Sequence, residues 1–302
     1  MKLRYFVEYV LFRLLIGFIC FFSPSNSVKV GRFLGRLAFK VDRKHRRIAV
    51  DNLSMALGMA EEEAISFSSL VFENLGQTFA EFMQPHRYGR AYVLDNVHVE
   101  GLDNLIEAEK KGKGVLVLAA HIGNWELLGS ALREHAGPVT VVYKKAKNPF
   151  VTEFIREARK GRGIDTIPHR NSARKILALL KKNETVGILL DQHATNKDAI
   201  TADFFDIPAA TNYGLALIAL KTGAPVVPAF MVRDENGGYR CVYEKAIELD
   251  KGDDLQEDIK SATSRFNEIL ERLIRRYPEQ WFWVHNRWKV KKYGRKKRRN
   301  RG

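Results

Sequence analysis

Cysteine is scarce in this chain: Cys20 and Cys241 are the only two among 302 residues. Two isolated cysteines, one in an apolar segment and one in a strand-like run, supply neither a disulfide framework nor the ligand spacing of a zinc site. Internal repeats and low-complexity linkers are also missing before the C-terminal tail. The length therefore predicts one large domain, or one domain with appendages, without disulfides or a structural zinc ion.

Acidic residues are outnumbered: 35 Asp and Glu stand against 50 Lys and Arg, so the formal net charge is +15. Residues 286–302, NRWKVKKYGRKKRRNRG, contain ten Lys or Arg and no acid, which is about two-thirds of this excess. Such a charge predicts an anionic partner, which is nucleic acid, anionic lipid or an acidic protein. A disordered, solubilising tail over residues 291–302 is the alternative interpretation.

The chain has one long apolar run, YFVEYVLFRLLIGFICFF at residues 5–22, and no small-x-small cleavage site follows it, which argues against a signal peptide. At about 1.5 Å per residue the run nearly crosses a hydrocarbon core of roughly 30 Å, although Glu8 and Arg13 interrupt it. We expect residues 1–25 to form a membrane anchor helix that either spans the bilayer or lies in its interface. A core helix of a soluble protein is the alternative.

The pattern beyond the anchor predicts two further regions. Apolar residues at helical spacing make residues 26–96 a helical region of the catalytic domain. From residue 97 to 290, strand-like and helix-like runs alternate, which predicts an α/β fold with a mainly parallel or mixed central sheet flanked by helices. The expected strands are residues 114–120, 138–144, 163–168, 185–191, 224–232 and, at an antiparallel edge, 239–249, with a long amphipathic helix at 255–276.

The most informative stretch is GVLVLAAHIGNWE, in which a strand of buried type ends at His121 and Glu126 follows at the start of a helix. Open α/β sheets bind ligands at the carboxyl ends of their strands. We expect the carboxylate of Glu126 to hold the imidazole of His121, which then acts as a general base. Since no Ser or Cys nucleophile is obvious nearby, a substrate hydroxyl is expected to attack directly. A satisfied histidine at a strand end is the alternative.

A second strand, TVGILLDQH, ends in Asp191 and Gln192, which would face the same crevice if the two strands are neighbours. Asp191 is expected to position a polar substrate group or a basic side chain, with capping of the following loop as the alternative. The N–H groups around Gly123 and Asn124 are candidate donors to an oxyanion. We expect no metal site, because no recognisable ligand spacing is present.

Two further segments have competing interpretations. Arg156 and Arg159 stand three residues apart on one helix face and form a cationic fork suited to phosphate or carboxylate, unless they are merely solvated. PEQWFWVHNRWK, residues 278–289, mixes three tryptophans with cations, which suits nucleobase stacking or a membrane interface. The apolar N-terminus favours the membrane. For the FF of ADFFDIPAATNYG, packing is the first explanation and contact with an acyl chain the second.

Several of these blocks together resemble the late acyltransferases of lipid A biosynthesis, whose fold is glycerolipid-acyltransferase-like. The matching segments, in order between about residues 5 and 290, are HIGNWE, REARKGRGIDTIP, LLDQH, FFDIPAATNYGLALIALKTGAPVVPAF and PEQWFWVHNRWK. FFD stands where FFG is common, and HNRW where HRRW or HRRF is common. These departures leave the chemistry intact and the exact acceptor open.

The resemblance implies a membrane-associated enzyme on the cytoplasmic face of a Gram-negative inner membrane. Such an enzyme moves a fatty acyl group from acyl carrier protein to a hydroxyl of a lipid A precursor, with no covalent acyl-enzyme, metal or cofactor. By position, His121 matches the general base and Glu126 its carboxylate partner. The residues that we place at the substrate are Asn124, Arg156, Arg159, Asp191 and Gln192.

Other functions stay open at this point. The first is a glycerophospholipid or other glycolipid O-acyltransferase that uses acyl-CoA or acyl carrier protein. Related glycerolipid enzymes usually carry His-x4-Asp and a later EGTR-like block, whereas this chain has Glu126 and no such block. A nucleic-acid-binding protein would use the tail and the tryptophans, yet it leaves the apolar N-terminus unexplained. An assembly protein on an inactive acyltransferase scaffold is the third alternative.

Overall fold

The computed structural model describes residues 2–84, 89–195, 198–234 and 236–289, so the expected basic tail at 291–302 lies outside the described residues. Its helices are α1 (Lys2–Phe21), α2 (Pro24–Val41), α3 (Arg43–Leu57), α4 (Glu61–Phe82), α5 (Arg90–Asn96), α6 (Leu102–Glu109), α7 (Trp125–Ala136), α8 (Pro149–Lys160), α9 (Ala173–Leu180), α10 (Gly214–Thr222), α11 (Leu255–Arg276) and the short 3-10 helix η2 (Pro278–Gln280). Its strands are β1 (Val97–Glu100), β2 (Val115–Ala119), β3 (Val139–Tyr143), β4 (Ile164–Pro168), β5 (Thr185–Leu189), β6 (Ala199–Phe204), β7 (Ile207–Asn212), β8 (Val226–Arg233) and β9 (Tyr239–Tyr243).

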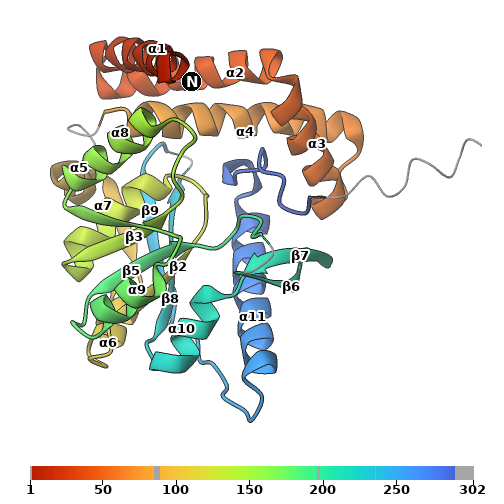
Figure 1. Ribbon diagram of the computed structural model, residues 1–302. Coiled ribbons are helices and arrows are strands. Elements are labelled where there is room, and N and C mark those ends of the chain that lie inside the picture. Colours follow the sequence, from red (N-terminus) through yellow and green to blue (C-terminus); the bar gives the residue numbers. More distant parts are fainter. Residues whose placement is uncertain (1, 85–88, 196–197, 235, 290–302) are drawn as a thin grey trace, which may run out of the picture.

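Seven strands form one mixed sheet in the order β1-β9-β8-β2-β5-β3-β4 (Figure 1). β9 runs antiparallel to β8, as expected, but β1 pairs with it in parallel and takes the edge position. β1 therefore covers β9, the expected edge strand. The sequence did not predict β1, because a strand of four residues is too short to leave a clear pattern. The α/β fold with a mixed sheet flanked by helices is confirmed.

The apolar run of β2 is explained by burial on both faces of the sheet. Leu116 and Leu118 belong to the core under α9, α10 and α11, whereas Val115, Val117 and Ala119 belong to the core under α6 and α7. Alternate side chains of a strand point to opposite faces, so a strand covered on both sides is apolar throughout. The chain leaves this strand at its carboxyl end and places His121 there.

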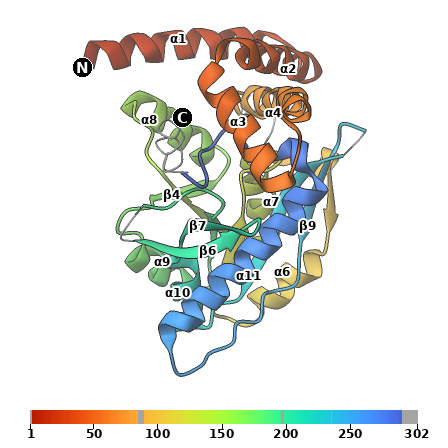
Figure 2. The ribbon, with the colours of Figure 1, turned by 90° about the vertical axis from the view of Figure 1, so that its right-hand side faces the viewer.

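The N-terminal helices form a layer at one end of the sheet, and the helices expected within residues 27–83 are present (Figures 1 and 2). α2 packs closely on α4 through Gly31, Gly35 and Gly76, since a Cβ on Gly35 would collide with the backbone of Phe72. α1 packs on α8 and α4 through Phe12, whose ring meets Phe154 edge-on at 5.3 Å. α1 is thus packed against the α/β part of the chain through α8.

None of the helices in the described part of the chain is both long enough and apolar enough to cross a membrane. The spanning form of the expected anchor is therefore not supported.

A β-hairpin, β6 and β7, occupies the segment ADFFDIPAATN, which the sequence pattern did not identify as strands. Phe205 and Asp206 form its two-residue turn with φ of 56° and 57°, the left-handed pair of a type I′ turn. Phe204 and Phe205 pack on three tryptophans that are at most 7% exposed: Trp281, Trp283 and Trp288. Packing thus explains these aromatics, and the expected interface role of the tryptophans is wrong because they are buried.

Candidate active site

His121 is held by Asp191, which comes from the neighbouring strand. The ring Nδ1 lies 2.8 Å from Asp191 Oδ1, and the backbone N–H of His121 donates to Asp191 Oδ2 at 3.1 Å. β2 and β5 are parallel neighbours with Ala119 opposite Leu189, so both strands deliver their next polar residues to one point. A proton on Nδ1 that is donated to Asp191 leaves Nε2 as the basic ring nitrogen.

The carboxylate of Asp191 is buried and fully hydrogen-bonded. The indole Nε1–H of Trp281 donates to its Oδ2 at 2.8 Å. Burial acts to raise the pKa of Asp191, but the attraction of His121 and the hydrogen bonds from His121 and Trp281 outweigh it and hold this pKa below its ordinary value. Asp191 is therefore an anion that orients the imidazole and does not face solvent.

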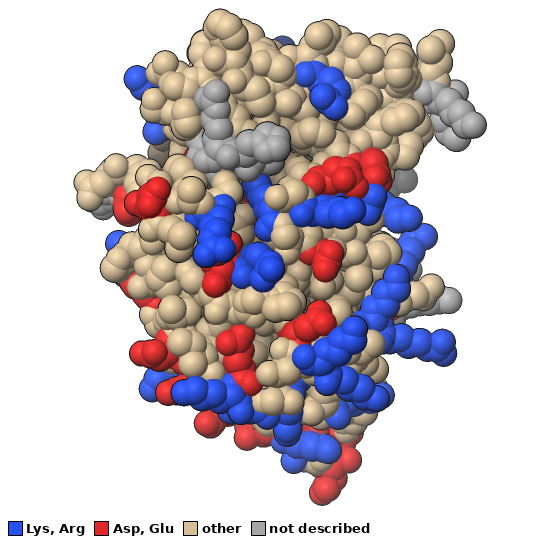
Figure 3. Space-filling model, turned by 90° about the vertical axis from the view of Figure 1, so that its left-hand side faces the viewer, with Lys and Arg blue, Asp and Glu red and all other residues tan. Residues whose placement is uncertain are grey.

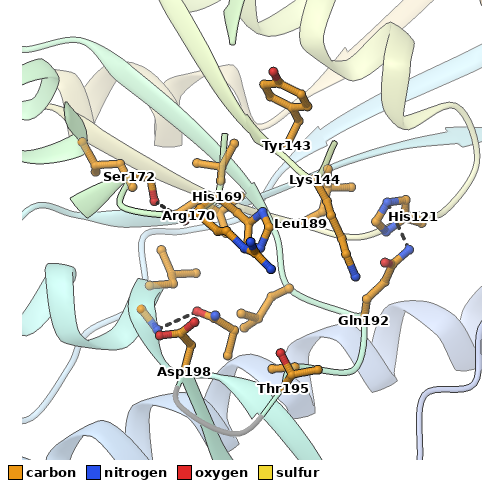
Figure 4. Close-up of a pocket in the computed structure, with 18 of the residues that line it drawn as sticks. His121, Tyr143, Lys144, His169, Arg170, Ser172, Leu189, Gln192, Thr195 and Asp198 are labelled. Atoms are coloured by element: carbon orange, nitrogen blue, oxygen red, sulfur yellow. Dashed lines mark hydrogen bonds between the residues drawn. The ribbon is translucent and has the colours of Figure 1, made fainter. Parts of the chain in front are cut away.

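The other side of the imidazole faces a cavity and the amide of Gln192. Gln192 Nε2 lies 3.4 Å from His121 Nε2, where it can donate only if that ring nitrogen is unprotonated (Figure 4). The side chain of His121 is 20% exposed, and it lines the cavity. A hydroxyl that enters the cavity can replace the amide as the partner of Nε2.

Glu126 binds Arg159 and not His121. Arg159 Nη2 and Nε donate to its two carboxylate oxygens at 2.7 and 3.0 Å, and each side chain is 12% exposed. Burial acts to raise the pKa of Glu126. The charges of Arg159, Arg162 and His121 outweigh this effect, so that the pKa of Glu126 lies below its ordinary value. The expectation that Glu126 holds the imidazole is corrected: the first turn of α7 points it at α8, and Asp191 takes its place.

Arg156 and Asn124 also lie elsewhere than expected. Arg156 is half-exposed and paired with Glu153 and Glu157, and it is not among the residues that line the cavity in front of His121. Asn124 is 2% exposed and caps α7, with its Oδ1 accepting from the N–H of Leu127. Neither residue lines the cavity that His121 faces.

The backbone donors that we expected to bind the oxyanion are occupied. The N–H of Gly123 donates to the carbonyl of Gln280, and the N–H of Asn124 donates to that of Met231. Gly123 has φ of +57° and lies so close to Met231 that a Cβ would collide with its carbonyl oxygen. This loop is therefore built for close packing against β8 and η2, not for binding substrate.

A buried ion pair beneath this loop has no signal in the sequence. Arg233 Nη2 lies 3.1 Å from Glu81 Oε2, which also accepts from Asn124 Nδ2 at 2.7 Å. Thr78 donates to the carbonyl of Gly123. Since Glu81 and Arg233 are 152 residues apart, only the fold reveals that α4 and β8 together fix the loop after His121.

The cavity in front of His121 has a volume of about 850 Å³. Trp125, Glu126, Arg159 and Gln192 lie with His121 on its wall. Apolar side chains from α9, α10, β5 and the residue after β5 form another part of the lining: Ile176, Ile188, Leu190, Leu215, Leu217 and Ile218. Among the described residues, no group of three or more His, Cys, Asp or Glu is arranged to hold a metal ion.

The fold and this site define a class of α/β proteins in which a histidine–carboxylate pair at the carboxyl edge of the sheet faces a partly apolar cavity. The profile of the bacterial lipid A biosynthesis acyltransferases matches residues 1–290. The chain belongs to this family and is an acyltransferase, as the resemblance of its motifs implied.

Curated relatives agree with this assignment. The chain is 29% identical to the lipid A biosynthesis palmitoleoyltransferase of Escherichia coli (strain K12) over 88% of its own length and 85% of the relative. It is 24% identical to the lipid A biosynthesis lauroyltransferase of the same strain, over 88% and 86% of the two chains. It is 26% identical to a phosphatidylinositol mannoside acyltransferase of Mycobacterium tuberculosis (strain CDC 1551 / Oshkosh), over 78% and 75%.

Proposed function

We propose that this enzyme transfers a fatty acyl group from the thioester of an acyl carrier protein to a hydroxyl of a lipid A precursor. The observation that carries the proposal is the His121–Asp191 pair, in which the imidazole's other nitrogen, Nε2, faces a partly apolar cavity. Family membership and two relatives that are named for lipid A acylation support the acceptor.

In the proposed reaction, Nε2 of His121 takes the proton of the acceptor hydroxyl while its oxygen attacks the thioester carbon. A C–O ester bond forms and the C–S bond breaks. The leaving thiolate then takes from the imidazolium the proton that came from the hydroxyl. Asp191 keeps Nδ1 protonated and stabilises the imidazolium through its negative charge. No step places the acyl group on the protein.

The oxyanion formed on the thioester carbonyl needs a hydrogen-bond donor, and Gln192 is the best-placed side chain. Its amide lies 3.4 Å from Nε2, so an incoming hydroxyl would release it to donate to the carbonyl oxygen beside the reacting atoms. This assignment replaces the N–H groups of Gly123 and Asn124. Glu126 and Arg159, as a rigid ion pair on the cavity wall, shape the site around Trp125 and His121.

The apolar lining suits the fatty acyl chain. Side chains of α9 and α10 line one part of the cavity, and they would limit the length of the acyl chain that fits. Each buried methylene group contributes about 0.8 kcal/mol, so selectivity between neighbouring chain lengths would be modest.

The function test is the replacement of His121 by Ala in the full chain. Loss of acyl transfer from acyl carrier protein to a lipid A precursor, in a variant with unchanged thermal unfolding, is expected. Mass spectrometry of lipid A from cells with either form provides the second readout. Turnover near that of the unchanged protein would eliminate His121 as the base, and altered glycerophospholipids beside an unchanged lipid A would assign a different acceptor.

A glycolipid acceptor of another kind is the second candidate. It is favoured by the relative named as a phosphatidylinositol mannoside acyltransferase, which matches 78% of this chain. Transfer of the same acyl group to a phosphatidylinositol mannoside but not to a lipid A precursor would establish it.

We further propose that α1 and α2 lie in the interface of the inner membrane, with the catalytic half on the cytoplasmic face. One side of α1 packs on the protein, while an apolar stripe on the other side is exposed: Leu3, Val7, Val10, Leu11, Leu14, Phe18 and Phe21. α2 adds Phe33, Leu37 and Val41, which are 59%, 46% and 69% exposed. In Figure 3 this end of the molecule carries few charged side chains, and Lys and Arg gather below it. Such a surface suits the boundary between headgroups and acyl chains.

Flotation with anionic phosphatidylglycerol vesicles tests this placement. Leu11→Ser, Leu14→Ser and Phe18→Ser together are expected to weaken vesicle binding at least tenfold, because they remove these large apolar side chains from the interface. Exposed leucines on other elements provide the matched control: Leu94→Ser, Leu177→Ser and Leu255→Ser. Equal binding of both triple variants would reject the proposed face.

A further inference from the structure

The two arginines that the sequence assigned to anionic substrate groups are already neutralised. Arg156 is paired with Glu153 and Glu157, and Arg159 makes a two-pronged bond to Glu126. A guanidinium that is bonded to a carboxylate has little attraction left for a second anion. If the substrate carries a phosphate, other cations of the cavity must bind it.

Two such side chains, Lys144 and Arg170, line the cavity, and the imidazole of His169 lines it with them. Lys144 follows β3, and His169 and Arg170 follow β4, its parallel neighbour. The N–H of His169 donates to the carbonyl of Tyr143 at 2.9 Å, which continues the β3–β4 pairing past Pro168 and keeps the two strand ends together. All three residues are exposed to solvent, and the register of the two strands brings them to the same edge of the sheet.

The three side chains extend into the same cavity as His121 and Gln192 (Figure 4). Within the described residues, neither Lys144 nor Arg170 forms an ion pair. Asp198 is a carboxylate that also lines the cavity, and it is not bonded to them in the described part of the chain. The described cations of the cavity that are not in ion pairs are therefore at the carboxyl ends of β3 and β4.

Charge complementarity identifies the ligand. The thioester and the acyl chain are uncharged, so neither explains unpaired cations that share their cavity. Arg and Lys on the wall of one cavity, together with an imidazole, form a donor set suited to phosphate. Under the proposed function both substrates carry phosphate: the donor in the phosphodiester of its phosphopantetheine arm, and the acceptor on its sugar.

We propose that Lys144, His169 and Arg170 form a phosphate subsite of the cavity, which binds a phosphate group of one of the two substrates. The proposal rests on the proposed function only in the choice of phosphate carriers. The phosphate subsite holds the substrate in place and takes no part in the proton transfer, which occurs at His121.

The first arm tests binding without turnover, in the otherwise intact chain with His121→Ala. The probes are acyl-4′-phosphopantetheine and acyl-pantetheine, which differ only in the phosphate, and a phosphorylated lipid A precursor with its dephosphorylated counterpart. Adding Lys144→Ala and Arg170→Ala is expected to raise the Kd of one phosphorylated probe at least tenfold, because two charge-assisted bonds are lost. The Kd of its phosphate-free counterpart is expected to stay the same.

The matched control replaces two exposed cations that do not line the cavity, Arg174→Ala in α9 and Lys181→Ala at the C-cap of α9. It removes the same charge from the surface and is expected to leave all four Kd values unchanged. Loss that depends on the donor's phosphate places the phosphopantetheine arm in the subsite, and loss that depends on the acceptor's phosphate places the sugar phosphate there. Equal losses with and without phosphate, or none, would overturn the proposal.

The second arm measures turnover with His121 intact. The double variant Lys144→Ala, Arg170→Ala is expected to raise KM for the substrate identified above at least tenfold and to change kcat less than threefold, because ground-state binding is lost. A loss confined to kcat would contradict a binding subsite. Failure of the His121→Ala function test would leave the probe binding measurement valid, so the two proposals fail separately.

Discussion

Two carboxylates lie beside His121, and their surroundings give them different chemistry. Asp191 binds an imidazole whose second nitrogen is open to the cavity, so a proton can be exchanged there. Glu126 binds a guanidinium that stays charged at any ordinary pH, so this pair exchanges no proton. The strand order β2–β5, and not the five-residue spacing from His121 to Glu126, decided which carboxylate became the partner of the histidine.

The sharpest test of this difference is Asp191→Asn. An amide in this position can still accept the Trp281 N–H, so folding is expected to persist, but it favours the imidazole tautomer with the proton on Nε2. We expect kcat to fall on the order of a thousandfold or more. Single-turnover acyl transfer, with near-UV circular dichroism to check the fold, is the measurement. A variant with more than a tenth of the original kcat would show that Asp191 does not support the base.

Gln192→Ala tests the open side of the same imidazole. Loss of a single oxyanion donor is expected to lower kcat about a hundredfold, with little change in KM. Gln192→Glu supplies a matched control of similar shape, which introduces a negative charge and should be slower still. If Gln192→Ala alters KM alone, the amide binds substrate in the ground state and does not stabilise the oxyanion.

Glu126→Gln is expected to act mainly on stability. It leaves Arg159 nearly buried without a counter-charge and beside Arg162, which should cost about 2 kcal/mol of unfolding free energy and less than tenfold in kcat. The double variant Glu126→Gln, Arg159→Met removes both charges and is expected to regain most of the lost stability. Urea unfolding of the two variants checks this.

The comparison would reverse under one outcome. If Glu126→Gln were as inactive as Asp191→Asn while fully stable, Glu126 would be the group that supports the base, as the sequence spacing suggested.

The sequence predicted both strand ends of the site but not their mutual position. His121 and Asp191 follow apolar runs that are clear in the sequence, and the expected crevice required only that β2 and β5 be neighbours, which no periodicity reveals. Glu126 was misassigned because nothing local shows that the first turn of α7 points at Arg159. The mixed sheet and its main helices follow from alternating apolar runs.

Elements whose stability depends on distant partners were not predicted. β1 has four residues and is stabilised by β9, and the β6–β7 hairpin is stabilised by tryptophans that lie 77 and 84 residues from Phe204. The sequence favoured a membrane interface for the tryptophans because cationic residues lie among them. It does not show that the tryptophans are buried. Glu81 and Arg233 carry no local signal, since a buried ion pair is defined by the two elements that exclude water from it.

His285 provides the smallest test, through the pH dependence of stability near the Asp191 pair. It accepts the N–H of His193 at 3.1 Å, and burial lowers its pKa to about 4 despite the opposing attraction of Asp191. Between about pH 6.5 and pH 4, His285 is neutral in the folded chain, whereas the unfolded chain binds a proton there. Stability should therefore fall as the pH decreases through this window. Asp191 and Glu126, whose pKa values are lowered, contribute stability that is lost only at still lower pH. His285→Gln keeps an acceptor for His193 and removes the titration, so its Tm should fall less, by a few degrees, between pH 7 and pH 5. Parallel Tm curves for the two proteins across this range would show that His285 binds protons equally in the folded and unfolded chains, so that folding does not lower its pKa.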